Sequence, residues 1–256
     1  MGQKGLPGPP GLPGDSIQGS KVILITPLEL VFVIDSSESV GPDNFGIIKT
    51  FMKTVIDKVS ANHATTRIGI INFSHKVELV SSLKQYSTKE LLKSAVNKMP
   101  YLGEGTYTAS AVQEAIRLFQ AARPAVRKVA VVITDGQADA RDEVQLDTVI
   151  REAHATNIEI FVIGIIQRTD PHYDDFLREM QLIATDPDEE HVYQIDDFMT
   201  LSGKISYFST RKLEMSTWES LAFAIARQGS PLSVGLCFSF GCSSFFCFSC
   251  IGKQIV

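Results

Sequence analysis

No cysteine precedes Cys237, and all four cysteines of the 256-residue chain lie between Cys237 and Cys250. The long stretch before them therefore has no internal disulfide and gives no information on redox compartment. The formal net charge is −5, which excludes the basic footprint of a nucleic-acid-binding protein. The chain starts with MGQK rather than with an apolar run, so no signal peptide is recognisable.

The sequence also shows none of the motifs by which enzymes bind phosphate or nucleotides. It has no Gly-rich phosphate loop with a lysine, and no G-x-G-x-x-G follows a predicted strand. A Mg²⁺-dependent phosphate-handling enzyme with Asp35 as nucleophile is the alternative of this class, but no histidine lies beside that loop. We therefore predict that the protein is not an enzyme. The histidines show no metal-ligand spacing and stand at His63, His75, His154, His172 and His191.

Glycine recurs at every third position of residues 2–16 (GQKGLPGPPGLPGDS), with proline third in several triplets. This is the collagen pattern, in which only glycine fits at the axis of the triple helix. The period stops at Ile17, and five triplets are too few to hold three chains together unaided. We interpret residues 1–16 as the end of a longer collagenous region, with a Pro/Gly-rich disordered leader as the alternative. Residues 17–27 follow as a linker.

Apolar runs alternate with amphipathic segments from residue 28 to residue 208. Unbroken apolar runs are typical of strands buried on both faces of a sheet, whereas alternation is typical of an edge strand. We predict strands at 28–34, 67–73, 77–83, 128–133, 158–166 and 191–195, with 77–83 antiparallel. We predict helices at 41–59, 88–99, 109–122, 142–156, 170–183 and 196–208. This order predicts an α/β fold: a doubly wound, mainly parallel six-stranded sheet with one antiparallel edge strand and helices on both faces.

Three of the predicted loops carry polar oxygens. The first buried strand, VFVI, runs directly into the motif D-x-S-x-S; a Gly-rich loop, GEGTYT, precedes a helix; and a later strand ends in T-D-G. In a parallel sheet these loops emerge at the same edge, where ligands of open α/β sheets bind. Two carboxylates and three hydroxyls should therefore converge there. They belong to Asp35, Ser37, Ser39, Thr106 and Asp135.

Such a set of oxygens predicts a site for a hard divalent cation. Mg²⁺ suits it best, with Mn²⁺ or Ca²⁺ as alternatives, because Mg²⁺ uses few protein carboxylates and keeps several waters. Hydroxyls are neutral, weak donors, so an ion held largely by hydroxyls and water stays electrophilic. An acidic residue of a partner could then complete the coordination shell. We expect the nearby Thr108 to cap a helix, and Glu38 and Glu104 to be solvated charges.

The combination resembles a known family. A D-x-S-x-S after a buried strand, a later G-x-G-T-x-T and a strand ending in T-D-G resemble the von Willebrand factor A domain and its metal-ion-dependent adhesion site. The resemblance covers about residues 28–208 and implies a Rossmann-like fold. With the Gly-X-Y repeat it points to collagens that carry A domains. The segments LELVFVIDSSESVGP, YLGEGTYTA, VITDGQADARD and IATDPDEEHVYQIDDF look most like the A domain after the collagenous region of type XXVIII collagen. Type VI collagen chains and matrilins look more distant.

The resemblance implies a non-catalytic module, secreted into the extracellular matrix, for adhesion or assembly. By it, the metal ligands are Asp35, Ser37, Ser39, Thr106 and Asp135. The implied partners are matrix proteins or cell-surface receptors that offer an acidic residue, and like collagen chains in a homotrimer. A metal-independent structural module that assembles only with like chains is the alternative. Neither reading calls for nucleic acid or a membrane.

Two features depart from the family pattern. No cysteine pair brackets the predicted domain, and residues 209–256 form an apolar tail rich in serine and cysteine. Its cysteine spacing suits no zinc site. We interpret this tail as an atypical end outside the domain, with a membrane anchor as the alternative. Asn72 heads a glycosylation sequon at the end of a predicted strand, and its occupancy is open.

Overall fold

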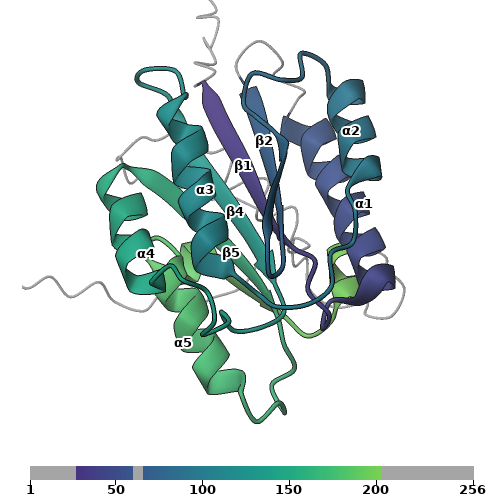
Figure 1. Ribbon diagram of the computed structural model, residues 1–256, viewed down its shortest axis with the longest axis vertical. Helices are drawn as coiled ribbons and strands as arrows, with labels where there is room; N and C mark the ends of the chain where they lie inside the picture. The colour runs from purple at the N-terminus through teal and green to yellow at the C-terminus, as the bar shows by residue number, and fades with distance from the viewer. Residues whose placement is uncertain (1–26, 60–65, 203–256) are drawn as a thin grey trace, which may run out of the picture.

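The computed structural model describes residues 27–59 and 66–202. Their centre is a six-stranded sheet with the order β3-β2-β1-β4-β5-β6 (Figure 1). All neighbouring pairs are parallel except β2 and β3, which are antiparallel at one edge. The predicted fold class is therefore confirmed. The strands are β1 (Leu28–Asp35), β2 (Thr66–Phe73), β3 (Val77–Ser81), β4 (Arg127–Thr134), β5 (Ile158–Ile165) and β6 (Val192–Ile195).

β1 lies in the interior of the sheet because its side chains are apolar on both faces. Leu30, Phe32 and Ile34 join one hydrophobic cluster, and Val31 and Val33 join the other. All of these side chains are inaccessible to solvent. A strand that alternates between two buried faces must be covered by helices on both sides. The D-x-S-x-S motif therefore begins where the most buried strand of the sheet ends.

Helices cover both faces of the sheet (Figure 1). Side chains of α1, α2 and the 3₁₀ helix η2 pack into one cluster, and those of α3, α4 and α5 pack into the other. This arrangement leaves the carboxyl ends of β1, β4, β5 and β6 at one edge of the molecule. The helices are α1 (Gly41–Val59), α2 (Lys89–Lys98), α3 (Thr108–Gln120), α4 (Leu146–Ala155), α5 (Tyr173–Ile183), α6 (Asp188–His191) and η2 (Phe198–Ser202).

α5 contacts β5 through a glycine. A Cβ placed on Gly164 would lie 1.7 Å from Met180 Sδ and 3.0 Å from Phe176 Cε1. Any larger residue would therefore collide with two side chains of α5. This glycine lets α5 lie close to the end of β5 at Phe176 and Met180.

Two helices begin later than predicted. Residues 142–145 form a loop, and α4 begins at Leu146. The carboxylate of Asp142 is used elsewhere, since it accepts a hydrogen bond from Ser110 N at 2.9 Å in the first turn of α3. The helix predicted from residue 170 begins at Tyr173, because Asp170 Oδ1 accepts from His172 N at 2.8 Å and closes a turn before the helix.

Other boundaries also differ from the prediction. The antiparallel edge strand ends at Ser81 rather than at residue 83, and β6 begins at Val192 because His191 closes α6. After β6 the chain forms a 3₁₀ helix where a longer helix, 196–208, was predicted; its residues 203–208 lie outside the described part.

The predicted collagenous segment, nearly all of the linker and the apolar tail lie outside the described residues. Within residues 27–59 and 66–202, no helix is both long enough and apolar enough to cross a bilayer. The described part therefore corresponds to most of the predicted domain.

Candidate metal centre

The loops that follow β1 and β2 and the loop that precedes α3 are joined by backbone hydrogen bonds. Ser36 N donates to Phe73 O at 2.8 Å, and Gly103 N donates to Ser36 O at 2.9 Å. Tyr107 N donates to Ser74 O at 2.8 Å. These bonds hold the D-x-S-x-S motif against the Gly-rich loop before any side chain is considered.

Asp35 is the deepest of the predicted site residues, with no exposed surface. Its Oδ1 accepts from Ser37 N at 2.8 Å, and its Oδ2 accepts from Thr134 Oγ1 at 2.7 Å. Burial raises the pKa of Asp35 to about 6, although the hydrogen bonds from Thr134 and Ser37 act in the opposite direction. The nearby Asp135 carboxylate adds a small repulsion. A positive charge beside this buried carboxyl group would stabilise its ionised form.

A chain of hydroxyls connects the first motif to the end of β4. The Ser37 and Ser39 hydroxyl oxygens lie 3.1 Å apart, and Ser39 Oγ donates to Asp135 Oδ1 at 2.7 Å. Because Ser39 uses its only proton on Asp135, the Ser37 hydroxyl donates to Ser39. Burial raises the pKa of Asp135, and the Ser39 hydrogen bond opposes that rise. The chain runs from buried Ser37 to exposed Ser39, so it opens to the surface.

Thr106 reaches the same place from the Gly-rich loop. A Cβ placed on Gly136 would lie 3.9 Å from Ser39 Oγ and 4.0 Å from Thr106 Oγ1, so both hydroxyls face the residue after Asp135. Asp139 N also donates to Thr106 O at 2.9 Å. The fold therefore brings together all five side chains that the sequence singled out.

The donor set fits a hard cation. It offers two carboxylates and three hydroxyls, which are the oxygen ligands that Mg²⁺ and similar ions accept. In the described residues no three His, Cys, Asp or Glu side chains form a metal-binding group. The buried carboxylate of Asp35 and the half-buried one of Asp135, both with raised pKa values, would gain from a cation between them.

Sequence reasoning missed two residues that position the site. Thr134 holds Asp35 across the sheet, although it stands directly before Asp135 in the T-D-G motif. Asp142 is buried and accepts from Ser110 N and Ser110 Oγ, and from Val144 N at 3.2 Å. It thereby joins the loop after β4 to the start of α3. A side chain that pairs across long separations leaves no local signal in the sequence.

Several expectations around the site change with the structure. Thr108 is not a helix cap: Tyr107 holds that position, and Thr108 Oγ1 is buried without a hydrogen-bond partner. Glu38 and Glu104 are exposed, as expected of solvated charges. Asn72 is fully buried and its Nδ2 donates to Pro100 O at 2.8 Å, so the sequon is inaccessible in the folded domain.

The four histidines within residues 27–59 and 66–202 form no metal-binding group with other His, Cys, Asp or Glu side chains. His75 lies near the centre, where its N donates to Glu104 O at 2.7 Å and its ring nitrogen Nδ1 lies 3.1 Å from the same oxygen. His191 is buried at the other end of β5, between Pro187 O and Glu159 Oε1. Both have local structural contacts.

Comparison with known proteins gives the family. Residues 29–206 match the model of the von Willebrand factor type A domain. Human matrilin-3 is 33% identical over 201 residues, which are 76% of this chain and 38% of that protein. Matrilin-1 of Gallus gallus is 36% identical over 180 residues, which are 69% of this chain and 34% of that protein. The chain thus spans less than half the length of these relatives.

Solved structures share the fold. Proximal thread matrix protein 1 from the mussel byssus, in a structure with a zinc-occupied MIDAS motif, superposes with a TM-score of 0.58 at 23% identity. That likeness covers 70% of this chain and 45% of that one. The pilus adhesin SpaC from Lactobacillus rhamnosus GG gives a TM-score of 0.61 at 16% identity over 79% of this chain and 30% of that one. These identities establish similarity of fold alone.

The relatives identified in this way are matrilins, and they do not support the finer expectation of an A domain nearest to that of type XXVIII collagen. The broader expectation, that the chain contains a von Willebrand factor A domain, is confirmed. The match over residues 29–206, together with the relatives above 30% identity, shows that this chain belongs to the von Willebrand factor type A domain family.

Proposed function

We propose that the chain is a non-catalytic adhesion or assembly module of the extracellular matrix that binds its partner through a divalent cation. The observation that carries the proposal is the hydrogen-bonded chain from Ser37 through Ser39 to Asp135, beside the buried carboxylate of Asp35. This is an oxygen site that opens to the surface at its hydroxyl end. The similarity to matrilins, and to a matrix protein whose structure has a zinc-occupied MIDAS motif, also supports a matrix module that uses a cation.

The proposed ligands, direct or through water, share the carboxyl edge of the sheet and are Asp35, Ser37, Ser39, Thr106 and Asp135. Mg²⁺ is the ion we favour, with Mn²⁺ or Ca²⁺ as alternatives, and it supplies an electrophilic centre to which a carboxylate of the partner can bind. The protein's own part is to position neutral hydroxyls rather than further carboxylates. Fewer fixed negative charges leave more of the positive charge for the incoming acid.

The partners that we propose are matrix proteins or cell-surface receptors with an exposed acidic residue. We place the A domain at residues 28–208, between a linker (17–27) and an atypical tail (209–256), and a Gly-X-Y segment at residues 1–16 supports a collagen context. Like chains forming a homotrimer would then be partners too. Secretion into the matrix follows from the same proposal.

The test is calorimetric titration of the full chain with MgCl₂. We expect saturable binding in the wild type, loss of binding in Asp135→Asn, and unchanged binding in the control Glu104→Gln, which alters an exposed carboxylate nearby. No binding by the wild type would refute the metal-bridged mechanism. Self-association that persists in EDTA, measured by sedimentation, would favour the metal-independent assembly module instead.

A further inference from the structure

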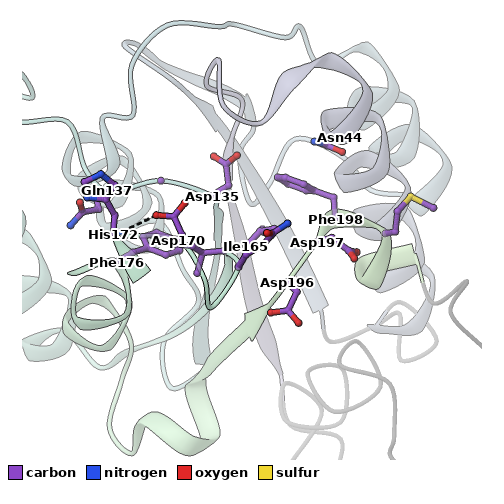
Figure 2. A pocket seen from close by; sticks show the side chains of 14 residues that line it. Asn44, Asp135, Gln137, Ile165, Asp170, His172, Phe176, Asp196, Asp197 and Phe198 are labelled. Atoms are coloured by element: carbon purple, nitrogen blue, oxygen red, sulfur yellow. Dashed lines mark hydrogen bonds between the residues drawn. The ribbon is translucent and has the colours of Figure 1, made fainter. Parts of the chain in front are cut away.

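A pocket lies directly beside the proposed metal site (Figure 2). It has a volume of about 560 Å³, within the range of small-molecule and side-chain pockets. Its walls come from the first turn of α1, the loops after β4 and β5, the start of α5 and the turn after β6. Asp135 lines the pocket and also accepts the Ser39 hydrogen bond. The two sites therefore share a wall.

The pocket has an apolar floor. Ile165, Phe176 and Phe198 line it and are themselves buried. Met199 adds a flexible apolar side chain that is 48% exposed. In Figure 2 the rings of Phe176 and Phe198 lie on opposite sides of the hollow, with Ile165 between them. Such a floor suits the methylene stem of a long side chain.

The rim of the pocket is acidic. Asp170, Asp196 and Asp197 line it, in addition to Asp135, and they come from two separate loops (Figure 2). No lysine or arginine lines the pocket, and His172 is its one basic side chain among the described residues. Four carboxylates around an apolar floor therefore create a negative potential that would attract a cationic group.

The charges on this rim are not neutralised by cations in the described part of the chain. Asp170 Oδ1 accepts from His172 N, and Asp197 Oδ1 accepts from Thr200 N at 2.9 Å. Asp196 Oδ1 accepts from the side-chain amide of Gln194 at 3.0 Å. Each of these partners is a neutral amide and brings no positive charge to the rim.

We propose that this pocket binds a lysine or arginine side chain of the partner, next to the carboxylate that binds the cation. The methylene stem lies on Ile165, Phe176 and Phe198, and the charged head lies among Asp170, Asp196 and Asp197. The inference rests on the proposed metal-bridged function and narrows the partner: its epitope carries an acidic and a basic residue close together. The two epitope residues must lie close together because Asp135 belongs both to the pocket and to the proposed metal site.

The pocket is tested first without the cation. The full chain, labelled at isoleucine and methionine methyls, is titrated in EDTA with Nα-acetyl-lysine-N-methylamide and with its uncharged analogue Nα-acetyl-norleucine-N-methylamide. We expect saturable shifts at Ile165 and Met199 with roughly five- to tenfold tighter binding of the lysine compound. The preference should weaken as NaCl is raised, because the rim charges are exposed.

The variant Asp196→Asn/Asp197→Asn should lose the preference for lysine while keeping the norleucine affinity. Asparagine keeps the side-chain oxygen that caps η2. The matched control is Asp147→Asn, an exposed aspartate on α4 outside the pocket, which should behave as wild type. Equal binding of the two compounds, no saturable shift at Ile165 and Met199, or an unchanged preference in the double variant would each overturn the proposal.

A second arm separates this proposal from the function on which it rests. Peptides with a lysine and a glutamate, joined by spacers of increasing glycine number, are compared with norleucine and glutamine counterparts in MgCl₂ and in EDTA. We expect one spacer length to bind best in MgCl₂, with both charged residues contributing. If replacing the glutamate by glutamine leaves the affinity in MgCl₂ unchanged while replacing the lysine by norleucine weakens it, the metal-bridged function is refuted. If only the glutamate replacement weakens the affinity, the pocket proposal is refuted.

Discussion

Replacing Asp35 by Asn removes a carboxyl group that is buried completely and whose pKa is raised to about 6 by that burial. In the unfolded chain the same group has a pKa near the ordinary value of 3.8 for an aspartate. Between these two values the folded protein holds a proton that the unfolded chain has released. Stability therefore falls as pH rises from about 4 to about 6, and it stays low above that range.

The size of this effect follows from the two pKa values. A difference of about two units corresponds to roughly 3 kcal/mol over the whole range. Between pH 4.5 and pH 7.5 the share that remains is about 2 kcal/mol, because the unfolded group is already largely ionised at pH 4.5. Asp135 and Glu179, whose pKa values burial also raises, act in the same direction in both proteins. Their effects cancel in the comparison.

The assay is urea unfolding of the full chain in EDTA, at pH 4.5 and pH 7.5. We expect the wild type to lose about 2 kcal/mol more than Asp35→Asn over this interval. Asparagine keeps the acceptor for Ser37 N, and the Thr134 hydroxyl can donate to Gly136 O at 3.1 Å instead. The control Asp147→Asn should follow the wild type. An equal pH dependence in wild type and Asp35→Asn would refute the burial argument.

Three further predictions concern the groups that position the site. Thr134→Val removes the donor to Asp35 Oδ2 and should destabilise the domain by about 1–3 kcal/mol at pH 7.5 and by less at pH 4.5, measured by urea unfolding. Asp142→Ala leaves the start of α3 uncapped and should lower the free energy of unfolding by about 2 kcal/mol. It should also weaken Mg²⁺ binding in calorimetry, and an unchanged Mg²⁺ affinity would contradict the positioning role of Asp142. Gly164→Ala should lower stability by about 1–3 kcal/mol, whereas the control Gly46→Ala, with open space around it, should not.

The sequence predicted the sheet, and the convergence of five polar side chains at its edge, because the signals for both are local. β1 contains an unbroken apolar run from Leu30 to Ile34, and the motifs that follow strands need only the rule that parallel strands end at one edge. Helix starts were predicted less well. Asp142 and Asp170 carry side chains typical of N-caps, yet Asp142 serves α3, across 32 positions, and Asp170 closes a turn. A propensity rule cannot decide which helix or turn an aspartate will serve.

The acidic pocket could not be predicted for a related reason. Its lining residues come from segments between Asn44 and Met199, and no short stretch of sequence contains more than a few of them. The aspartates on its rim look like ordinary turn residues one by one. Only the sheet order, which places the ends of β4, β5 and β6 side by side, gathers them around an apolar floor.

The hydrogen bonds between the loops explain how hydroxyls could form a cation site at all. A hydroxyl is a weak ligand, so its contribution is easily lost if the loop that bears it must first be ordered. Here Gly103 N to Ser36 O, Tyr107 N to Ser74 O and Asp139 N to Thr106 O fix the loops to one another through the backbone. The loops are thus ordered without an ion, and a cation bound here would meet oxygens that already face one another. In the proposed function, weak ligands on a rigid frame would leave the cation short of ligands, and a carboxylate from the partner would supply the remaining binding energy.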